Sequence, residues 1–184
     1  MPLQQQRLAV VVMGVSGTGK SSVAASLAGA LGVPWIDGDD LHAPEAVARM
    51  RGGQSLTDED RWPWLARIGA CLVNATASPD GVVVACSALK RAYRDRLRGA
   101  APGMHFVFLD GPRALIQQRL AERSGHYMPP TLLDSQLQTL EKPDASEPDV
   151  LHAGIDQPVP SIAASVSARL LDEAVTARFP RAFS

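Results

Sequence analysis

The sequence predicts a single α/β domain with a parallel five-stranded sheet that is covered by helices on both faces. Two observations lead to this prediction. Five apolar runs of strand length alternate with helical stretches, and a glycine-rich loop joins the first run to a helix. A length of 184 residues suits one domain with a sizeable core, so residues 1–184 are treated as one unit.

Residue patterns place each element in turn. The predicted strands span residues 8–13, 33–36, 82–86, 104–109 and 150–153. The predicted helices span residues 21–31, 44–50, 58–77, 90–98, 112–123, 131–140 and 161–177. Gly32 ends the alanine-rich first helix, and Thr57 can cap the long helix with Asp60 three residues further on. Pro112 occupies a favourable first-turn position.

Composition and charge exclude several classes of protein. Hydrophobic residues make up 46% and charged residues 20%, which is ordinary for a globular protein. A net charge of −1 gives no general basic field, so we expect no nucleic-acid partner. No apolar run is long enough to span a membrane, and the N-terminal run reads as a core strand, not as a signal peptide. Two cysteines cannot build a disulfide framework, which favours a reducing cytoplasm.

The glycine-rich loop matches the Walker A pattern G-x-x-x-x-G-K-[ST]. Glycines let the backbone turn tightly, so that its N–H groups point at phosphate oxygens, and the following helix adds its positive dipole end. Lys20 can reach the β- and γ-phosphates, and the Ser21 hydroxyl can ligate Mg²⁺. We therefore predict ATP and Mg²⁺ as cofactors. The predicted nucleotide-binding residues here are Gly14, Val15, Ser16, Gly17, Thr18, Gly19, Lys20, Ser21 and Ser22.

Two motifs that the sequence lacks narrow the range of reactions that this nucleotide-binding loop could serve. The sequence has no guanine-specific N-K-x-D motif and no apolar strand that ends in Asp-Glu, the pair that hydrolytic ATPases use. A small kinase is therefore favoured over a switch GTPase or a motor ATPase.

The second predicted strand is followed by "DGDDLH", which suggests the acceptor side of such a kinase. Ligands of open α/β sheets bind at the carboxyl ends of strands. Asp37 can hold a Mg²⁺-bound water, and Asp39 can accept the proton of an acceptor hydroxyl. His42 is a candidate acceptor contact. The alternative is a solvated turn in which Asp40 caps the next helix.

Basic residues beyond this turn are candidates for an anionic acceptor, because guanidinium forks suit carboxylates and phosphates. We place the acceptor-binding segment at about residues 38–78. The candidates are Arg49, Arg61, Lys90 and Arg94, of which the last two lie four apart on one predicted helix face. Solvated surface charge is the alternative for each. Trp62 and Trp64 are expected to pack, and Cys86 is expected in the core.

A mobile lid is predicted over about residues 119–140. Arg119 and Arg123 lie four apart on one helix face, and glycine and prolines follow them. Lids exclude water and bring cations onto the transferring phosphoryl group. We therefore assign these two arginines to catalysis, together with Lys20 and Asp39. The alternative is that both arginines belong to a solvated helix face.

Taken together, the motifs resemble the gluconate kinases (gluconokinases) of the small, adenylate-kinase-like P-loop family. The resemblance runs from residue 8 to about 170 and is carried by "MGVSGTGKSSVA", "DGDDLH", "LTDEDRWPWL", "CSALKRAYRDRLR", "RLAERSGHYM" and "IDQP". It implies a P-loop NTPase fold with strand order 2-3-1-4-5 and ATP-dependent phosphorylation of D-gluconate to 6-phosphogluconate. It also implies a cytoplasmic homodimer, an acceptor contact by His126 and a nucleotide contact by Gln157.

Without the family resemblance, the residues predict a less specific function. They predict a Mg²⁺-ATP kinase for a small, anionic, hydroxylated acceptor. A shikimate-like or other small-molecule kinase is the alternative among enzymes, and a non-catalytic nucleotide-binding module is the alternative from another class.

Overall fold

The computed structural model describes residues 8–77, 81–122 and 130–178. Its centre is one five-stranded sheet with the order β2-β3-β1-β4-β5, in which each neighbouring pair is parallel. The predicted α/β class and strand order are confirmed. The strands are β1 (Ala9–Met13), β2 (Trp35–Asp37), β3 (Val82–Ala85), β4 (His105–Asp110) and β5 (Val150–Gly154).

The helices also lie where the sequence predicts them, to within a few residues at their ends. They are α1 (Lys20–Leu31), α2 (Pro44–Arg51), α3 (Asp58–Ala77), α4 (Arg91–Ala100), α5 (Arg113–Glu122), α6 (Pro130–Thr139) and α7 (Val159–Arg178), with a short 3₁₀ helix, η1 (Gly38–Leu41), that the sequence did not predict. The predicted cap of α3 is present. The Asp60 N–H donates to Thr57 Oγ1, and Asp60 Oδ2 accepts from the Thr57 N–H at 2.9 Å.

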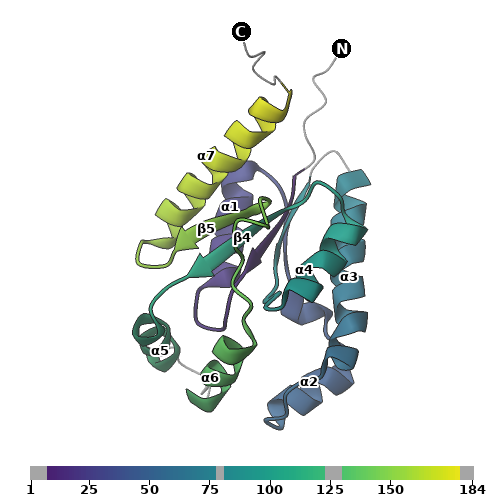
Figure 1. Cartoon of the computed structure of the whole chain (residues 1–184), viewed down its shortest axis with the longest axis vertical. Helices are drawn as coiled ribbons and strands as arrows, with labels where there is room; N and C mark the ends of the chain where they lie inside the picture. Colours follow the sequence, from purple (N-terminus) through teal and green to yellow (C-terminus); the bar gives the residue numbers. More distant parts are fainter. Residues whose placement is uncertain (1–7, 78–80, 123–129, 179–184) are drawn as a thin grey trace.

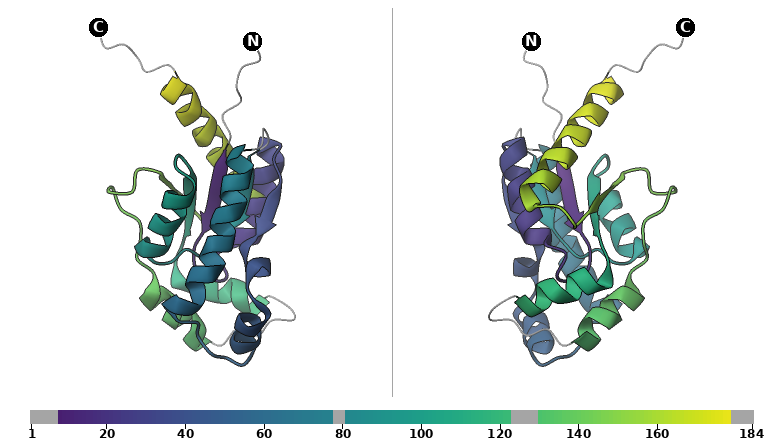
Figure 2. Two further views of the ribbon diagram at one scale, coloured as in Figure 1. Left: turned by 90° about the vertical axis from the view of Figure 1, so that its right-hand side faces the viewer. Right: turned by 90° about the vertical axis from the view of Figure 1, so that its left-hand side faces the viewer.

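Helices cover both faces of the sheet. Alternate residues of β1 enter two separate cores, as the two-residue period of a strand requires. Val10 and Val12 pack with residues of α1 and α7, whereas Val11 and Met13 pack with residues of α3 and α4. Figure 2 looks onto α3 in its left view and onto α7 in its right view.

The remaining helices gather at one end of this sandwich. Figure 1 shows α2, α5 and α6 at its lower end, beside the loop that joins β1 to α1. The carboxyl ends of parallel strands, where ligands of this fold class bind, are thus bordered by helices.

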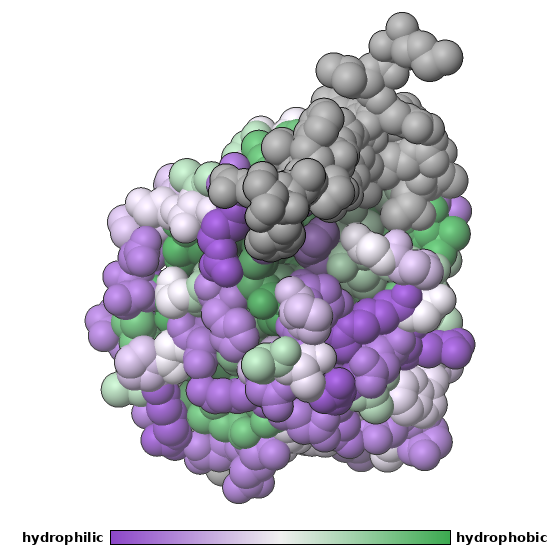
Figure 3. Space-filling model, turned by 45° about the horizontal axis from the view of Figure 1, so that its top comes forward, coloured by the Kyte–Doolittle hydropathy of each residue, from purple (hydrophilic) through white to green (hydrophobic). Residues whose placement is uncertain are grey.

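No helix within residues 8–77, 81–122 and 130–178 is long and apolar enough to cross a membrane. Figure 3 shows the apolar residues of one face as scattered patches among polar ones. Among the side chains that the structure describes, the large apolar ones that are exposed are those of Trp35, Met50, Trp62, Val73 and Leu171.

Candidate active site

The phosphate loop spans Gly14 to Ser21, between β1 and α1. Gly17 and Gly19 have φ angles of 86° and 90°, a region that residues with a Cβ rarely adopt. Gly17 also lies against α5, because a Cβ there would approach the Leu120 side chain to 2.7 Å. The Gly14 N–H donates to the Ser87 carbonyl oxygen at 3.3 Å, which ties the loop to the segment after β3.

Side chains of the loop fold back onto its own backbone. Thr18 Oγ1 donates to the Val15 carbonyl oxygen at 2.8 Å, and Lys20 Nζ donates to the same oxygen at 3.2 Å. The Lys20 ammonium group therefore lies over the loop, where a bound phosphate chain would meet it. This placement supports the predicted role of Lys20 in neutralising phosphate charge.

Ser21 and Asp37 join the loop to the end of β2. Ser21 Oγ donates to Asp37 Oδ2 at 2.6 Å, while Asp37 Oδ1 accepts from the Asp39 N–H at 3.0 Å. A hydroxyl and a carboxylate are hard oxygen ligands of the kind that Mg²⁺ prefers, and Mg²⁺ usually combines a few of these with water and substrate phosphates. Within the part of the chain that the structure describes, no three His, Cys, Asp or Glu residues form a metal-binding group. The Ser21–Asp37 pair fits Mg²⁺ that is shared with a nucleotide, whose phosphates would supply further oxygen ligands.

The turn that carries Asp37 and Asp39 is fixed by a contact with α3. Gly38 is buried against β3, and a Cβ at this position would collide with the Ala85 carbonyl oxygen. The carbonyl oxygen of Gly38 accepts a 2.6 Å hydrogen bond from Trp64 Nε1, and Trp64 is 1% exposed. Packing is therefore the role of Trp64, as the sequence predicts.

His42 stacks on the Trp64 ring, with 4.3 Å between ring centroids. Burial lowers the pKa of His42, against the opposing effect of the Asp39 carboxylate, and the Arg61 and Arg67 charges lower it further. The lowered pKa favours the neutral imidazole. Its Nδ1 is buried, with no hydrogen-bond partner in the described parts of the chain. The ring as a whole is only partly buried, so its accessible part can donate to, or accept from, an acceptor hydroxyl.

Two of the predicted acceptor cations are already paired with carboxylates of α3. Arg49 donates to Asp60 at 2.7 Å, and Lys90 donates to both oxygens of Asp58 at 2.8 and 2.9 Å. These pairs bring both cations to the first turn of α3. An anionic acceptor at this position would meet positive charge that is partly neutralised.

Asp58 is a residue of this region that the sequence did not single out. It accepts hydrogen bonds from Lys90 and Tyr93, and these lower its pKa. Arg61, whose Nε donates to the Leu56 carbonyl oxygen, lies with its guanidinium carbon 6.0 Å from the centre of the Tyr93 ring. Only the folding of α4 against α3 brings these groups together, so no local sequence signal could have revealed Asp58.

The structure gives Arg94 a different role from the predicted acceptor contact. Its side chain is 1% exposed and makes five hydrogen bonds, two of them to Glu147 and the others to the Ala88, Leu89 and Glu141 carbonyl oxygens. A guanidinium has five N–H donors, so none remains for a substrate. Arg94 holds α4 to the segment before β5, and its assignment to the acceptor site is corrected.

Arg119 lies beside the phosphate loop. Its guanidinium donates to the Ile155 carbonyl oxygen at 2.5 Å, and Nη1 lies 3.9 Å from the point where a Cβ on Gly19 would be. Gln157 is exposed in the turn after Ile155, the residue whose carbonyl oxygen accepts from Arg119. Arg123 and His126 lie outside the described residues.

The described part of the predicted lid is packed on the body of the protein. Leu133 of α6 is 0% exposed in the core, and Arg113 of α5 pairs with Asp134 of α6 at 2.6 Å. Movement of these helices on substrate binding stays a prediction. Elsewhere, Cys86 is 1% exposed, which confirms a core cysteine, and its burial raises the pKa of the thiol to about 12.

Comparison with known proteins agrees with this geometry. A family model described as "AAA domain" matches residues 10–143. A gluconokinase of Gluconobacter oxydans is 48% identical over 81% of this chain and 84% of its own length, and the thermosensitive gluconokinase of Escherichia coli is 40% identical over 83% and 81%. The crystal structure of a gluconokinase from Sinorhizobium meliloti is 47% identical, with a TM-score of 0.86 over 96% of this chain and 99% of that one. A chain with this loop, this acidic turn and this degree of likeness belongs to the gluconokinase family of P-loop kinases.

Proposed function

We propose that this protein transfers the γ-phosphoryl group of ATP to the primary hydroxyl of D-gluconate and releases ADP and 6-phosphogluconate. One relationship carries the proposal. Asp37 accepts from Ser21 of the phosphate loop and from the Asp39 N–H, which supports a nucleotide end of the site that lies beside Asp39, the candidate base of the acceptor end. The relatives are named gluconokinases, and this is the reason for proposing gluconate as the acceptor.

The chain's own residues have separable tasks in this reaction. The Lys20 ammonium group and the Arg119 guanidinium stabilise charge on the transferring phosphoryl group. Asp39 orients the gluconate hydroxyl and takes its proton while the new O–P bond forms and the bond from the γ-phosphorus to the β-phosphate oxygen breaks. Ser21 and Asp37 would hold Mg²⁺, which supplies positive charge on the phosphate oxygens.

The acceptor's carboxylate fits the positive charge near α3. Arg49, Arg61 and Lys90 supply this charge, and neutral His42 adds a hydroxyl contact. Asp60 and Asp58 already pair with Arg49 and Lys90, so this charge is partly neutralised. We expect the positive charge that remains to favour the acid over its uncharged analogue.

The test is ADP release, coupled to a reporter reaction, with gluconate, shikimate, glucose and nucleoside monophosphates offered separately. We expect rapid turnover with gluconate and little with glucose. Turnover with shikimate alone would make the protein a shikimate-like kinase. ATP binding without ADP release for any acceptor would make it a non-catalytic nucleotide-binding module.

Three further properties belong to this proposal, namely Mg²⁺ dependence, a homodimer and a cytoplasmic location. Residual activity in excess chelator would contradict the first. A monomeric mass in light scattering at micromolar concentration would contradict the second. Fractionation of the source cells tests the third.

A further inference from the structure

A side chain of α6 contacts the phosphate loop. Gln136 Oε1 accepts from the Ser16 N–H at 2.7 Å, and Gln136 Nε2 donates to Ser16 Oγ at 3.0 Å. A backbone N–H can only donate, so the carboxamide oxygen must face it and the orientation of the amide is fixed. The two residues are separated by 120 positions in the chain.

Gln136 projects from a helix that is well anchored. Leu133, one turn earlier, is 0% exposed in the core, and Asp134 pairs with Arg113 at 2.6 Å. Just beyond α6, the Glu141 N–H donates to the Leu89 carbonyl oxygen at 2.9 Å. The carboxamide is therefore presented to the loop from a helix that is itself fixed to α5 and to the segment after β3.

The neighbouring loop residue is held as well. Gly17 packs on Leu120 and Ile116 of α5, where a Cβ would approach their side chains to 2.7 and 3.1 Å. Consecutive residues of the loop are thus braced by two helices, one through apolar contact and one through hydrogen bonds. Figure 1 shows α5 and α6 side by side next to this loop.

We propose that Gln136 is a positioning residue that holds the phosphate loop in its nucleotide-binding conformation. The backbone N–H groups of such a loop bind phosphate well only when they already point inward, because any ordering on binding costs affinity. Gln136 acts through Ser16, so it need not touch the nucleotide. This inference deepens the proposed function, on which it rests, but its primary test is nucleotide binding without acceptor.

Gln136→Met keeps the length and helix propensity of the side chain and removes both hydrogen bonds. Two ordinary hydrogen bonds are together worth about one factor of ten or more in an equilibrium constant. We expect the Kd values of MgADP and MgATP to rise about tenfold, measured by calorimetry. Ser16→Ala removes only the bond to Oγ and should give a smaller rise. The Ser16 amide should also exchange its hydrogen faster in Gln136→Met.

Gln138→Ala is the matched control, since Gln138 is an exposed glutamine on the same helix. Its Kd values should equal those of the wild type. Unchanged Kd values for Gln136→Met would overturn the proposal, even if its Tm falls, because that result describes a purely structural contact. Tighter binding would overturn it too, since Gln136 would then compete with phosphate. Failure of the wild type to phosphorylate gluconate would refute the proposed function and leave these Kd comparisons intact.

Discussion

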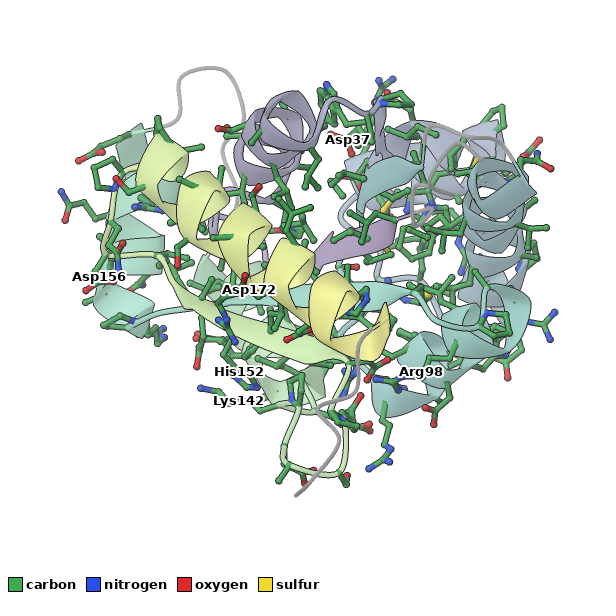
Figure 4. All side chains as sticks on the ribbon, turned by 90° about the horizontal axis from the view of Figure 1, so that it is seen from above. Asp37, Arg98, Lys142, His152, Asp156 and Asp172 are labelled. Carbon is green, nitrogen blue, oxygen red and sulfur yellow. The ribbon has the colours of Figure 1, made fainter. Side chains whose placement is uncertain are left out.

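Trp64 of α3 donates its indole N–H to the carbonyl oxygen of Gly38 at 2.6 Å, across 26 positions of the chain. Gly38 lies between Asp37 and Asp39, so this bond ties the long helix to the acidic turn of the site. Asp37 on its strand end can be found in Figure 4, where it is labelled. The position of both carboxylates thus depends on a buried residue that contacts no substrate in the proposed mechanism.

Trp64→Phe removes this bond and leaves a buried carbonyl oxygen without its partner, which costs about 1–3 kcal/mol. We expect a lower Tm and a kcat reduced about tenfold or more, because the turn shifts. The Kd of MgADP should stay near the wild-type value. An unchanged kcat in a folded variant would show that the turn keeps its position without Trp64. Trp62→Phe, at an exposed tryptophan of the same helix, is the control.

Lys20→Ala should lower turnover by about 10²-fold or more, because the variant loses charge stabilisation of the transferring phosphoryl group. Circular dichroism should show that the fold survives. Initial rates at saturating gluconate and ATP measure the effect. Near-normal turnover would mean that the phosphate-loop role of Lys20 is wrong.

Asp37→Asn keeps the shape of the side chain but removes the charge that would favour Mg²⁺. We expect the Mg²⁺ concentration for half-maximal activity to rise about tenfold, since carboxylates are preferred ligands of this ion. The Ser21 hydroxyl can still donate to the amide oxygen, so the Tm should change little. An unaltered Mg²⁺ titration would remove Asp37 from the metal site.

Asp39 is tested by two substitutions. If its basicity dominates, as we expect, Asp39→Asn and Asp39→Ala should both reduce kcat by ~10²–10⁴-fold. If it mainly positions gluconate, Asn should retain much more kcat than Ala, and Ala should raise KM for gluconate. Wild-type kinetics for Asp39→Ala would exclude the residue from the site and shift attention to Asp37.

Glu147 makes stability depend on pH. Hydrogen bonds from Arg94, and then from Arg98, hold the pKa of Glu147 down at about 2, against the opposing effect of burial. A lowered folded-state pKa adds stability that is fully present above the ordinary value of 4.5 and is lost as the pH falls toward 2. We therefore expect the Tm of the wild type to fall over this range.

Glu147→Gln should lower stability at pH 7 by about 3 kcal/mol or more, since it leaves buried Arg94 without its charge partner. The Tm difference from the wild type should shrink between pH 4.5 and pH 2. Glu59→Gln, at an exposed position, should show neither effect. A Tm difference that does not vary with pH would contradict the assignment.

Much of this protein can be predicted from its sequence. Apolar runs of strand length place the strands, and glycine and capping residues place the helix ends, because these signals act within a few residues. The Thr57–Asp60 cap and the loop before Lys20 are examples, and both lie where predicted. The strand order came from family resemblance, since local patterns carry no information on which strands pair.

Only the tertiary structure decided which groups meet. The sequence places Lys90 and Arg94 on one helix face, yet Lys90 pairs with Asp58, 32 positions away, and Arg94 is buried against Glu147, 53 positions away. The Gln136–Ser16 contact spans 120 positions. Such partners are selected by how helices pack on the sheet and by the need to satisfy each buried charge and N–H group. The sequence determines the chemical nature of each side chain, but the packing of helices on the sheet determines which groups that side chain contacts.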